Sequence, residues 1–283
     1  MRWLVTGAGG QLGHHLMQQL PSADVVGLTR AELDITSAVA VREMIADADP
    51  DVVVNAAAYT AVDAAESDEH TARAVNVDGP ANLAAAVAER GGCRLVHVST
   101  DYVFGGAGNR PYEVSDPTEP RTAYGRTKLA GERAVADLLP GRGHIVRTAW
   151  VYGGPGANFV DTMLRLEAER DTVDVVCDQV GSPTWVGDLA GALVELGRSA
   201  VGGSLMHFVN AGAASWFDLA QETFRLAGAD PARVRPVTSE AFVRPAPRPA
   251  WSVLSTTSWT ARGFTAPRDW RAALRDYVLG RRA

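Results

Sequence analysis

Tyr124 and Lys128 stand four residues apart, a spacing that places both side chains on one face of a helix. The pKa of a tyrosine phenol is near 10, so the group needs a nearby cation before it ionises readily at neutral pH. A lysine ammonium supplies that charge and also donates to a ribose hydroxyl. Lys128 is the only lysine among 27 basic residues, so its position relative to a tyrosine is informative. The pair predicts a proton-transfer site; a surface helix with a chance pair is the alternative.

Two hydroxyl side chains end the apolar run at residues 94–99 and begin the segment after it. Ligands of open α/β sheets bind at the carboxyl ends of the strands. Ser99 or Thr100 is therefore placed to donate a hydrogen bond to a substrate carbonyl beside Tyr124. Capping of the strand end by these residues is an equally good interpretation.

A glycine-rich segment follows the first apolar run, residues 2–6. Gly7, Gly10 and Gly13 have the spacing G-x-x-G-x-x-G and precede a helix expected over residues 11–20. Glycines at this spacing permit a tight turn, close approach of the backbone to a pyrophosphate, and packing of the helix on the strand. The N-terminus of the helix then faces the phosphates. The segment predicts a dinucleotide site, with a plain glycine-rich turn as the alternative.

The end of the apolar run at residues 25–28 bears on the choice of dinucleotide. NAD-binding proteins place Asp or Glu there for the ribose 2′-hydroxyl, whereas an arginine accommodates the phosphate of NADP. Thr29 and Arg30 follow the run, and no acid stands at its tip. NADPH is therefore favoured, with NADH as the alternative. Glu32 is either without a role in binding or a weak NAD ligand. If Arg30 does not bind the phosphate, it is a solvated charge in the loop.

These groups lie on a regular alternation of apolar runs and helical segments. The runs lie at residues 2–6, 25–28, 51–55, 94–99 and 144–147, and the helices at 11–20, 37–47, 69–90 and 122–138. Such an alternation predicts right-handed βαβ units, and hence an α/β fold with a doubly wound, Rossmann-like parallel sheet. We assign residues 1–150 to a dinucleotide-binding domain. Residues 151–283 are expected to form mainly a smaller substrate-binding lobe, with some segments returning to the first domain.

The second half of the chain is less regular. Its expected helices cover residues 158–170, 186–197, 216–227 and 269–279, and its extended segments residues 172–177 and 205–209. The proline-rich segment at residues 244–249 cannot be regular.

The composition narrows the class of protein. The 283 residues carry a formal net charge of −6, which argues against nucleic acid as the main partner. No apolar run reaches the length of a membrane span. Cys93 and Cys177 give neither a disulfide framework nor a zinc site. We expect a cytoplasmic protein that is a monomer or a homodimer.

Seven motifs occur in order between Thr6 and Leu254: TGAGGQLG, NAAAYTAVDAAE, STDYVF, YGRTKLAGE, RTAWVYG, DQVGSPTW and RPAWSVL. By these motifs the chain resembles the extended short-chain dehydrogenase/reductases and, within them, the dTDP-4-dehydrorhamnose reductase family. The Tyr-x-x-x-Lys pair is shared by the whole superfamily. STDYVF together with NAAAYTAVDAAE and DQVGSPTW is much more specific.

The resemblance implies a reaction and a set of residues for it. NADPH would reduce the C4 keto group of a dTDP-4-keto-6-deoxy-L-hexose, giving dTDP-L-rhamnose. Tyr124 would give the proton, Lys128 would lower the pKa of Tyr124 and hold the nicotinamide ribose, and Thr100 would bind the keto oxygen. The implied cofactor-binding residues are Gly7, Gly9, Gly10, Gln11, Leu12, Gly13, Thr29, Arg30, Asp34, Ile35, Asn55, Ala56, Ala57, Ala58, Tyr59, Thr60, Ser99, Tyr124 and Lys128. The implied substrate-binding residues are Thr100, Asp101, Tyr102, Trp150, Asn158, Gln179 and Arg248.

Some of the implied substrate residues have simpler interpretations. Arg248 suits a diphosphate, because a guanidinium donates two parallel hydrogen bonds. Trp150 is otherwise a residue of the core. Asn158 and Gln179 are otherwise loop and strand-end hydrogen-bonding residues.

Two departures from the family pattern affect these expectations. Some relatives dimerise through Mg²⁺ held by glutamates, one of them in the first helix, where this chain has His14 and His15. Because Mg²⁺ prefers oxygen ligands, we expect no metal. Trp251 stands where a smaller polar residue is usual, which leaves the exact sugar open.

The sequence also bears on other functions found among similar proteins. Tyr102 follows Thr100-Asp101 where dehydratases have a second acid, and epimerases usually have an acid at the end of the second strand. Two alternatives stay open. One is a reductase of a related dTDP-ketosugar, such as dTDP-dihydrostreptose synthase. The other is a non-catalytic NADP-binding regulatory subunit, such as that of methionine adenosyltransferase.

Overall fold

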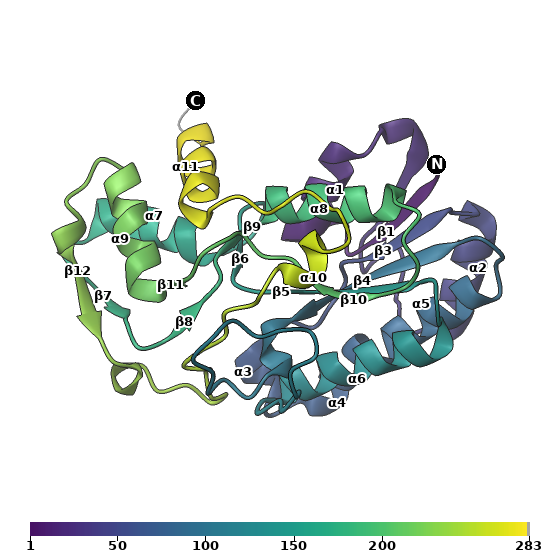
Figure 1. Ribbon diagram of the computed structural model, residues 1–283, viewed down its shortest axis with the longest axis horizontal. Helices are drawn as coiled ribbons and strands as arrows, with labels where there is room; N and C mark the ends of the chain where they lie inside the picture. The colour runs from purple at the N-terminus through teal and green to yellow at the C-terminus, as the bar shows by residue number, and fades with distance from the viewer. Residues whose placement is uncertain (282–283) are drawn as a thin grey trace.

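A six-stranded parallel sheet forms the centre of the computed structural model, which describes residues 1–281 (Figure 1). The strand order is β10-β5-β4-β3-β1-β2, and every neighbouring pair is parallel. The strands are β1 (Trp3–Thr6), β2 (Val25–Leu28), β3 (Val52–Asn55), β4 (Arg94–Thr100), β5 (Gly143–Thr148) and β10 (Leu205–His207). The first five arise from the five predicted apolar runs. The predicted α/β, doubly wound, Rossmann-like fold is confirmed.

Helices cover both faces of this sheet (Figure 1). Leu4, Val53 and Leu95 point to the face of α2 (Ala38–Ala48), α5 (Gly79–Ala88) and α6 (Ala123–Leu138). Their neighbours Val5, Val54 and Val96 point to α1 (Gln11–Gln19) and α8 (Val186–Arg198). This alternation is the period of two of a β-strand, and burial of both faces explains why the strands read as unbroken apolar runs.

Side-chain caps set where many of the helices begin. A hydroxyl, amide or carboxylate oxygen at the N-cap accepts from a backbone N–H of the first turn, which otherwise has no partner. The residues that do so are Ser37, Asp68, Thr122, Asn158, Ser215 and Asp269.

The helix predicted over residues 69–90 is present, since residues 69–88 are helical without a break, but it is not a regular α-helix. The segment forms α4 (Glu69–Arg73), a π-helical turn η2 (Ala74–Asp78) and α5. Pro80 has no N–H for the carbonyl of Asn76, so the regular ladder cannot continue there. The Asn76 side chain instead binds the chain at Tyr59, accepting from its N–H at 2.9 Å and donating to its carbonyl at 3.1 Å.

A second group of elements lies beside the sheet, at the left of Figure 1. It contains α7 (Phe159–Glu169), α9 (Trp216–Leu226), α11 (Trp270–Gly280) and a parallel pair, β7 (Val173–Val176) with β12 (Val234–Val237). The sequence did not predict β12. Two more short pairs are β6 (Val151–Tyr152) with β9 (Thr184–Trp185), and β8 (Val180–Gly181) with β11 (Ala214–Ser215).

The remaining short helices are α3 (Val62–Ala65), α10 (Thr257–Thr260), η1 (Ser22–Asp24), η3 (Asp101–Val103), η4 (Pro231–Arg233) and η5 (Ser239–Ala241). Helix α8 and strand β10 come from the second half of the chain but belong to the central layers. The division into domains at residue 150 stays a prediction, and residues 282 and 283 lie outside the described part.

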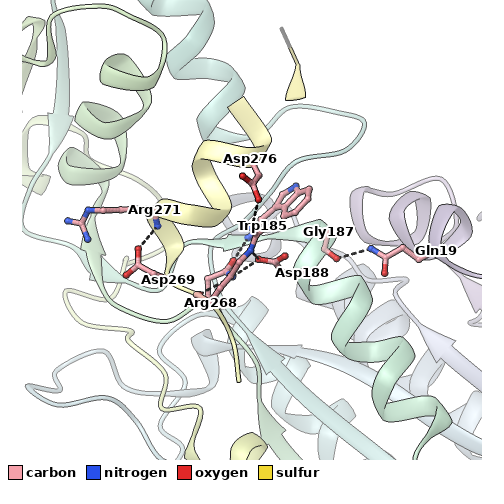
Figure 2. A network of polar contacts seen from close by, with 9 residues as sticks. Gln19, Trp185, Gly187, Asp188, Arg268, Asp269, Arg271 and Asp276 are labelled. Carbon is pink, nitrogen blue, oxygen red and sulfur yellow. Dashed lines mark hydrogen bonds and ion pairs between the residues drawn. The ribbon is translucent and has the colours of Figure 1, made fainter. Parts of the chain in front are cut away.

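Arg268 links the C-terminal helix to the central layers (Figure 2). Its guanidinium forms ion pairs with Asp188 at the start of α8, at 2.8 Å, and with Asp276 on α11. It also lies over the ring of Trp185, 5.1 Å from the centroid. Gln19 of α1 donates to the carbonyl of Gly187 at 2.8 Å, so α1 and α11 are both fixed to the first turn of α8.

Within residues 1–281, no helix combines the length and the apolar character that a membrane crossing requires.

Candidate active site at the carboxyl ends of the strands

The glycine-rich loop between β1 and α1 is closely packed and open to an anion. Gly7 has φ +72°, and a β-carbon there would lie 2.7 Å from the backbone nitrogen of Ala57. A β-carbon at Gly13 would overlap the carbonyl of Gly7. Helix α1 begins at Gly10 without a side-chain cap. The N–H groups of its first turn are therefore free of side-chain partners and suit a phosphate.

Two adjoining cavities lie over this loop. The larger has a volume of about 600 Å³ and the smaller about 330 Å³, and both are lined by Gly10, Ala56, Ala57 and Ala58. The smaller cavity extends to the end of β2, where it is lined by Gly7, Gly9, Thr29, Arg30, Leu33, Asp34, Ile35, Tyr59 and Val75. The larger extends over β4, where it is lined by Gln11, Leu12, Thr60, Ser99, Thr100, Asp101, Tyr102, Tyr124, Lys128 and Trp150 among others. Most of the predicted site residues thus line one continuous groove.

Arg30 is the cationic side chain of the smaller cavity. Glu32 is engaged elsewhere: its carboxylate accepts from the backbone N–H of Thr29 at 2.8 Å and from the Thr29 hydroxyl at 2.7 Å. Both hydrogen bonds lower the pKa of Glu32, the backbone bond more. Glu32 is absent from the lining of the cavity, whose charged side chains are Arg30 and Asp34, so the positive charge there comes from Arg30.

Tyr124 and Thr100 meet at the centre of the larger cavity. The hydroxyl of Thr122 accepts from the N–H of Gly125 at 3.0 Å, which fixes Tyr124 in the first turn of α6. Burial raises the pKa of Tyr124 to about 12, and a hydrogen bond to Thr100 opposes that effect. The pKa therefore lies above its ordinary value, whereas the sequence predicts a lowered one, because burial removes the hydration that a phenolate needs. Lowering by Lys128 stays a prediction.

Lys128 is almost completely buried, with 2% of its surface exposed. Its ammonium nitrogen donates to the carbonyl of Val98 at 2.7 Å and lies 3.5 Å from Nε2 of His97. Burial lowers the pKa of Lys128 to about 8, and Glu132 opposes that effect.

Asp101 is a second titratable group in the lining of the larger cavity. Burial raises the pKa of its carboxyl to about 6, while the nearby Ser252 and a hydrogen bond from Thr100 oppose that rise. The Thr100 hydroxyl donates to Asp101 Oδ1 at 3.0 Å. The neighbouring Tyr102 ring contacts the ring of Tyr124 edge-on, with 5.5 Å between centroids.

Trp150 and Trp216 form a parallel stack at the wall of the larger cavity, with 3.5 Å between ring centroids and 2° between planes. Trp150 has φ 46°, a conformation unusual for a residue with a β-carbon. Sequence reasoning missed Trp216, which comes from α9 in the second group of elements. Its only local signal is the capping box of Ser215 and Asp218, which starts the helix and says nothing of the stack.

Four polar atoms of the larger cavity have no hydrogen-bond partner among the described residues. They are Gln11 Oε1, Ser99 Oγ, Asp101 Oδ2 and Thr148 Oγ1, and all are buried. Because buried polar groups in proteins are nearly always hydrogen-bonded, these atoms fit a polar ligand. The N-terminus of α1 has no side-chain cap, and Arg30 lines the same groove. Together with the unpartnered polar atoms, these features suit a nicotinamide dinucleotide.

Five of the predicted residues do not line either cavity. Gly13 supports the loop, and Asn55 accepts from Ala57 N–H at 3.2 Å beneath it. Asn158 caps α7, Gln179 donates to Ser239 Oγ at 2.9 Å, and Arg248 donates to Asp63 Oδ2 at 2.8 Å. A substrate-binding role for the last three stays a prediction.

No three His, Cys, Asp or Glu side chains within residues 1–281 are grouped so as to hold a metal ion. Trp251 donates from Nε1 to the carbonyl of Arg110 at 2.8 Å. The expected lack of a metal, the lack of a nucleic-acid partner, and the monomeric or homodimeric state stay predictions.

Comparison with known proteins identifies the family. The model of the RmlD substrate binding domain matches residues 1–281. A dTDP-4-dehydrorhamnose reductase of Streptomyces griseus is 55% identical over 279 residues, which cover 96% of this chain and 91% of that protein. The chain belongs to the dTDP-4-dehydrorhamnose reductase family. This confirms the resemblance inferred from the motifs and assigns the chain to a family of oxidoreductases.

Two further relatives extend this result. A structure of the dTDP-4-dehydrorhamnose reductase of Bacillus anthracis in complex with NADP has a TM-score of 0.94 and 36% identity, and each chain covers 99% of the other. A Streptomyces antibioticus protein, described as a probable dTDP-4,6-dihydroxy-2-methyloxan-3-one 4-ketoreductase, is 51% identical over 278 residues. That alignment covers 98% of this chain and 94% of the relative. Two relatives that are each more than 50% identical to this chain are thus named for different substrates.

Proposed function

We propose that this protein uses NADPH to reduce the C4 keto group of a dTDP-4-keto-6-deoxy-L-hexose, giving dTDP-L-rhamnose. The observation that carries the proposal is the convergence of Tyr124, Thr100 and Lys128 on one cavity that continues over the glycine-rich loop. Family membership supports the dTDP-ketosugar as the substrate class. The relative that holds NADP supports the cofactor.

Each of the three side chains has a distinct task in this reaction. Bound NADPH supplies the hydride that reaches C4. The Thr100 hydroxyl turns from Asp101 Oδ1 to donate its hydrogen bond to the keto oxygen, and Tyr124 donates its proton to that oxygen as negative charge develops. Because the pKa of Tyr124 is raised to about 12, its phenol is protonated and ready to donate at neutral pH. Lys128 holds the nicotinamide ribose next to this pair.

The direct test is sugar-dependent oxidation of NADPH. The purified protein is mixed with NADPH and dTDP-6-deoxy-L-lyxo-4-hexulose, and the absorbance of the reduced nicotinamide is followed. We expect loss of absorbance only when the sugar is present, with dTDP-L-rhamnose as the product. Binding of NADPH without turnover would contradict the proposal. It would favour a non-catalytic NADP-binding subunit or another dTDP-ketosugar.

The second candidate is a reductase of a related dTDP-ketosugar, dTDP-dihydrostreptose synthase being one example. The 51% identical ketoreductase of Streptomyces antibioticus favours it, because that protein is named for a substrate other than dehydrorhamnose. A side-by-side assay with the D-configured dTDP-4-keto-6-deoxyglucose tests one such related ketosugar. Faster turnover of that sugar would replace the first substrate assignment and leave the mechanism intact.

Arg30→Ala is expected to weaken the binding of NADPH by roughly 10- to 100-fold and to leave NADH nearly unchanged. The reason is that the Arg30 guanidinium lines the small cavity, where it pairs with the 2′-phosphate that only NADPH carries. Dissociation constants for both dinucleotides, measured by quenching of tryptophan fluorescence, give the comparison. Arg42→Ala is the control, since Arg42 is an exposed arginine paired with Glu89 on the neighbouring helices. Equal weakening of both dinucleotides by Arg30→Ala would show that Arg30 does not distinguish them.

A further inference from the structure

A row of buried polar side chains crosses the sheet beneath the cofactor loop and ends at Lys128. Thr6, Asn55 and His97 are register partners on the adjacent strands β1, β3 and β4. All three are buried, and hydrogen bonds connect them in sequence. His97 then reaches the ammonium nitrogen of Lys128, which lies 3.5 Å from its Nε2.

The orientation of the Asn55 amide is fixed by its neighbours. Its Oδ1 accepts from the backbone N–H of Ala57 at 3.2 Å and from the hydroxyl of Thr6 at 2.7 Å. A backbone N–H can only donate, so the atom that faces it must be the oxygen. The other end of the amide, Nδ2, therefore faces Nδ1 of His97 at 3.0 Å and donates to it.

This donation determines which nitrogen of His97 carries a hydrogen. Complete burial, and next the charge of Lys128, hold the pKa of His97 well below its ordinary value, so the ring is neutral and carries one N–H. Because Nδ1 accepts from Asn55, that hydrogen is on Nε2. The nitrogen that faces Lys128 is thus a donor.

We propose that His97 is a positioning residue for Lys128. The Nε2–H of His97 favours the uncharged amine of Lys128 over its ammonium form. An uncharged amine has a lone pair that accepts this N–H while the amine donates to the carbonyl of Val98. An ammonium has only hydrogens to offer, and it would meet the Nε2–H with like polarity. The row from Thr6 to His97 therefore sets the proton equilibrium of the one lysine in the proposed active site.

Other charged groups near Lys128 act in both directions. On the same helix, Glu132 favours the ammonium, but both its oxygens accept from Arg147 of β5, at 2.9 and 2.7 Å. Tyr124 from α6 and Asp101 from η3 line the same cavity. His97 differs from them because it contacts the Lys128 nitrogen directly and cannot turn while Asn55 holds it.

The single lysine makes the test direct. Protein grown with [ε-¹³C]lysine carries its label at Lys128 alone, so the chemical shift of one resonance against pH reports its titration. In the wild type we expect a midpoint well below that of a free lysine. His97→Asn keeps an acceptor for Asn55 but removes the group at the Nε2 position. We expect it to raise the midpoint by about one pH unit.

His144→Asn is the matched control. His144 is also a buried histidine in a strand of the sheet, but its Nδ1 contacts Ser204 and it lies apart from Lys128. We expect this variant to leave the lysine titration unchanged. An unchanged midpoint in His97→Asn, or an equal shift in His144→Asn, would overturn the proposal.

If His97→Asn does not fold, a measurement on the wild type tests the proposed protonation of His97. Ring ¹⁵N–¹H correlations identify which nitrogen of each histidine is protonated, and we expect His97 to carry its hydrogen on Nε2. A hydrogen on Nδ1 would overturn the proposal. Neither measurement uses a substrate, so the result is independent of the proposed function.

The proposal connects to that function through the pH profile of turnover. Lys128 is an ammonium below its pKa and loses its proton as the pH rises through it. We expect kcat to fall on the alkaline side as the ammonium that holds the ribose is lost, and we expect His97→Asn to move this fall to higher pH.

Discussion

Tyr124→Phe is expected to lower kcat by about 10²- to 10⁴-fold while the binding of NADPH is retained. The substitution removes one hydroxyl, which is the proposed proton donor to the alkoxide, and leaves the ring that packs against Tyr102. Because the pKa of Tyr124 is raised by burial, the proton is held on the phenol until the alkoxide forms. Steady-state kinetics with NADPH and the dTDP-ketosugar measure the effect on kcat, and fluorescence titration measures NADPH binding.

The matched control is Tyr152→Phe. Tyr152 is buried, its hydroxyl has no hydrogen-bond partner among the described residues, and it does not line either cavity. We expect this variant to keep wild-type kcat. Full activity in Tyr124→Phe would eliminate Tyr124 as the proton donor. An equal loss in both variants would mean that removal of any buried tyrosine hydroxyl disturbs the fold.

Arg147→Met is expected to reduce the free energy of unfolding by about 3–5 kcal/mol. Arg147 and Glu132 form a bidentate ion pair in which both side chains are at most 5% exposed. Removing the guanidinium leaves the Glu132 carboxylate buried without its counter-charge, which is far more costly than the loss of an exposed pair. Equilibrium unfolding in urea measures the change.

The surface pair of Arg126 with Glu69 supplies the comparison. These side chains are 45% and 47% exposed, so Arg126→Met should cost less than about 1 kcal/mol. In the double variant Glu132→Leu with Arg147→Met both charges of the buried pair are removed together. It should therefore be more stable than Arg147→Met alone. A loss below about 1 kcal/mol for Arg147→Met would show that water reaches the Glu132 carboxylate.

The parts of the fold that local chemistry controls could be predicted from sequence. Each of the five apolar runs became a strand of the central sheet, because burial on both faces requires an unbroken apolar run. The helix at residues 69–90 was predicted, but its π-helical turn was not, for an equally physical reason. Its composition favours one helix, but Pro80 and the contact of Asn76 with Tyr59 interrupt the ladder, and only packing places Tyr59 there.

The residues of the candidate site also divide into those that local spacing predicted and those whose contacts only the tertiary structure shows. Tyr124 and Lys128 were found by their spacing, and the glycine loop by its spacing and its place between strand and helix. Arg248 was implied by the family resemblance and supported by the chemistry of its guanidinium, and the structure pairs it with Asp63, 185 residues away in sequence. No local sequence pattern marked Trp216 as a site residue, since its stack on Trp150 forms between elements that are far apart in sequence.

The sequence by itself determined the sheet, the dinucleotide loop and the Tyr–Lys pair, since each depends on residues a few positions apart. Only the tertiary structure decided the charge states within the site. Burial raises the pKa of Tyr124 and lowers that of Lys128, and the contact of His97 with Lys128 needs β4 and α6 to pack together. Desolvation depends on everything that surrounds a group, and no spacing along the chain encodes it.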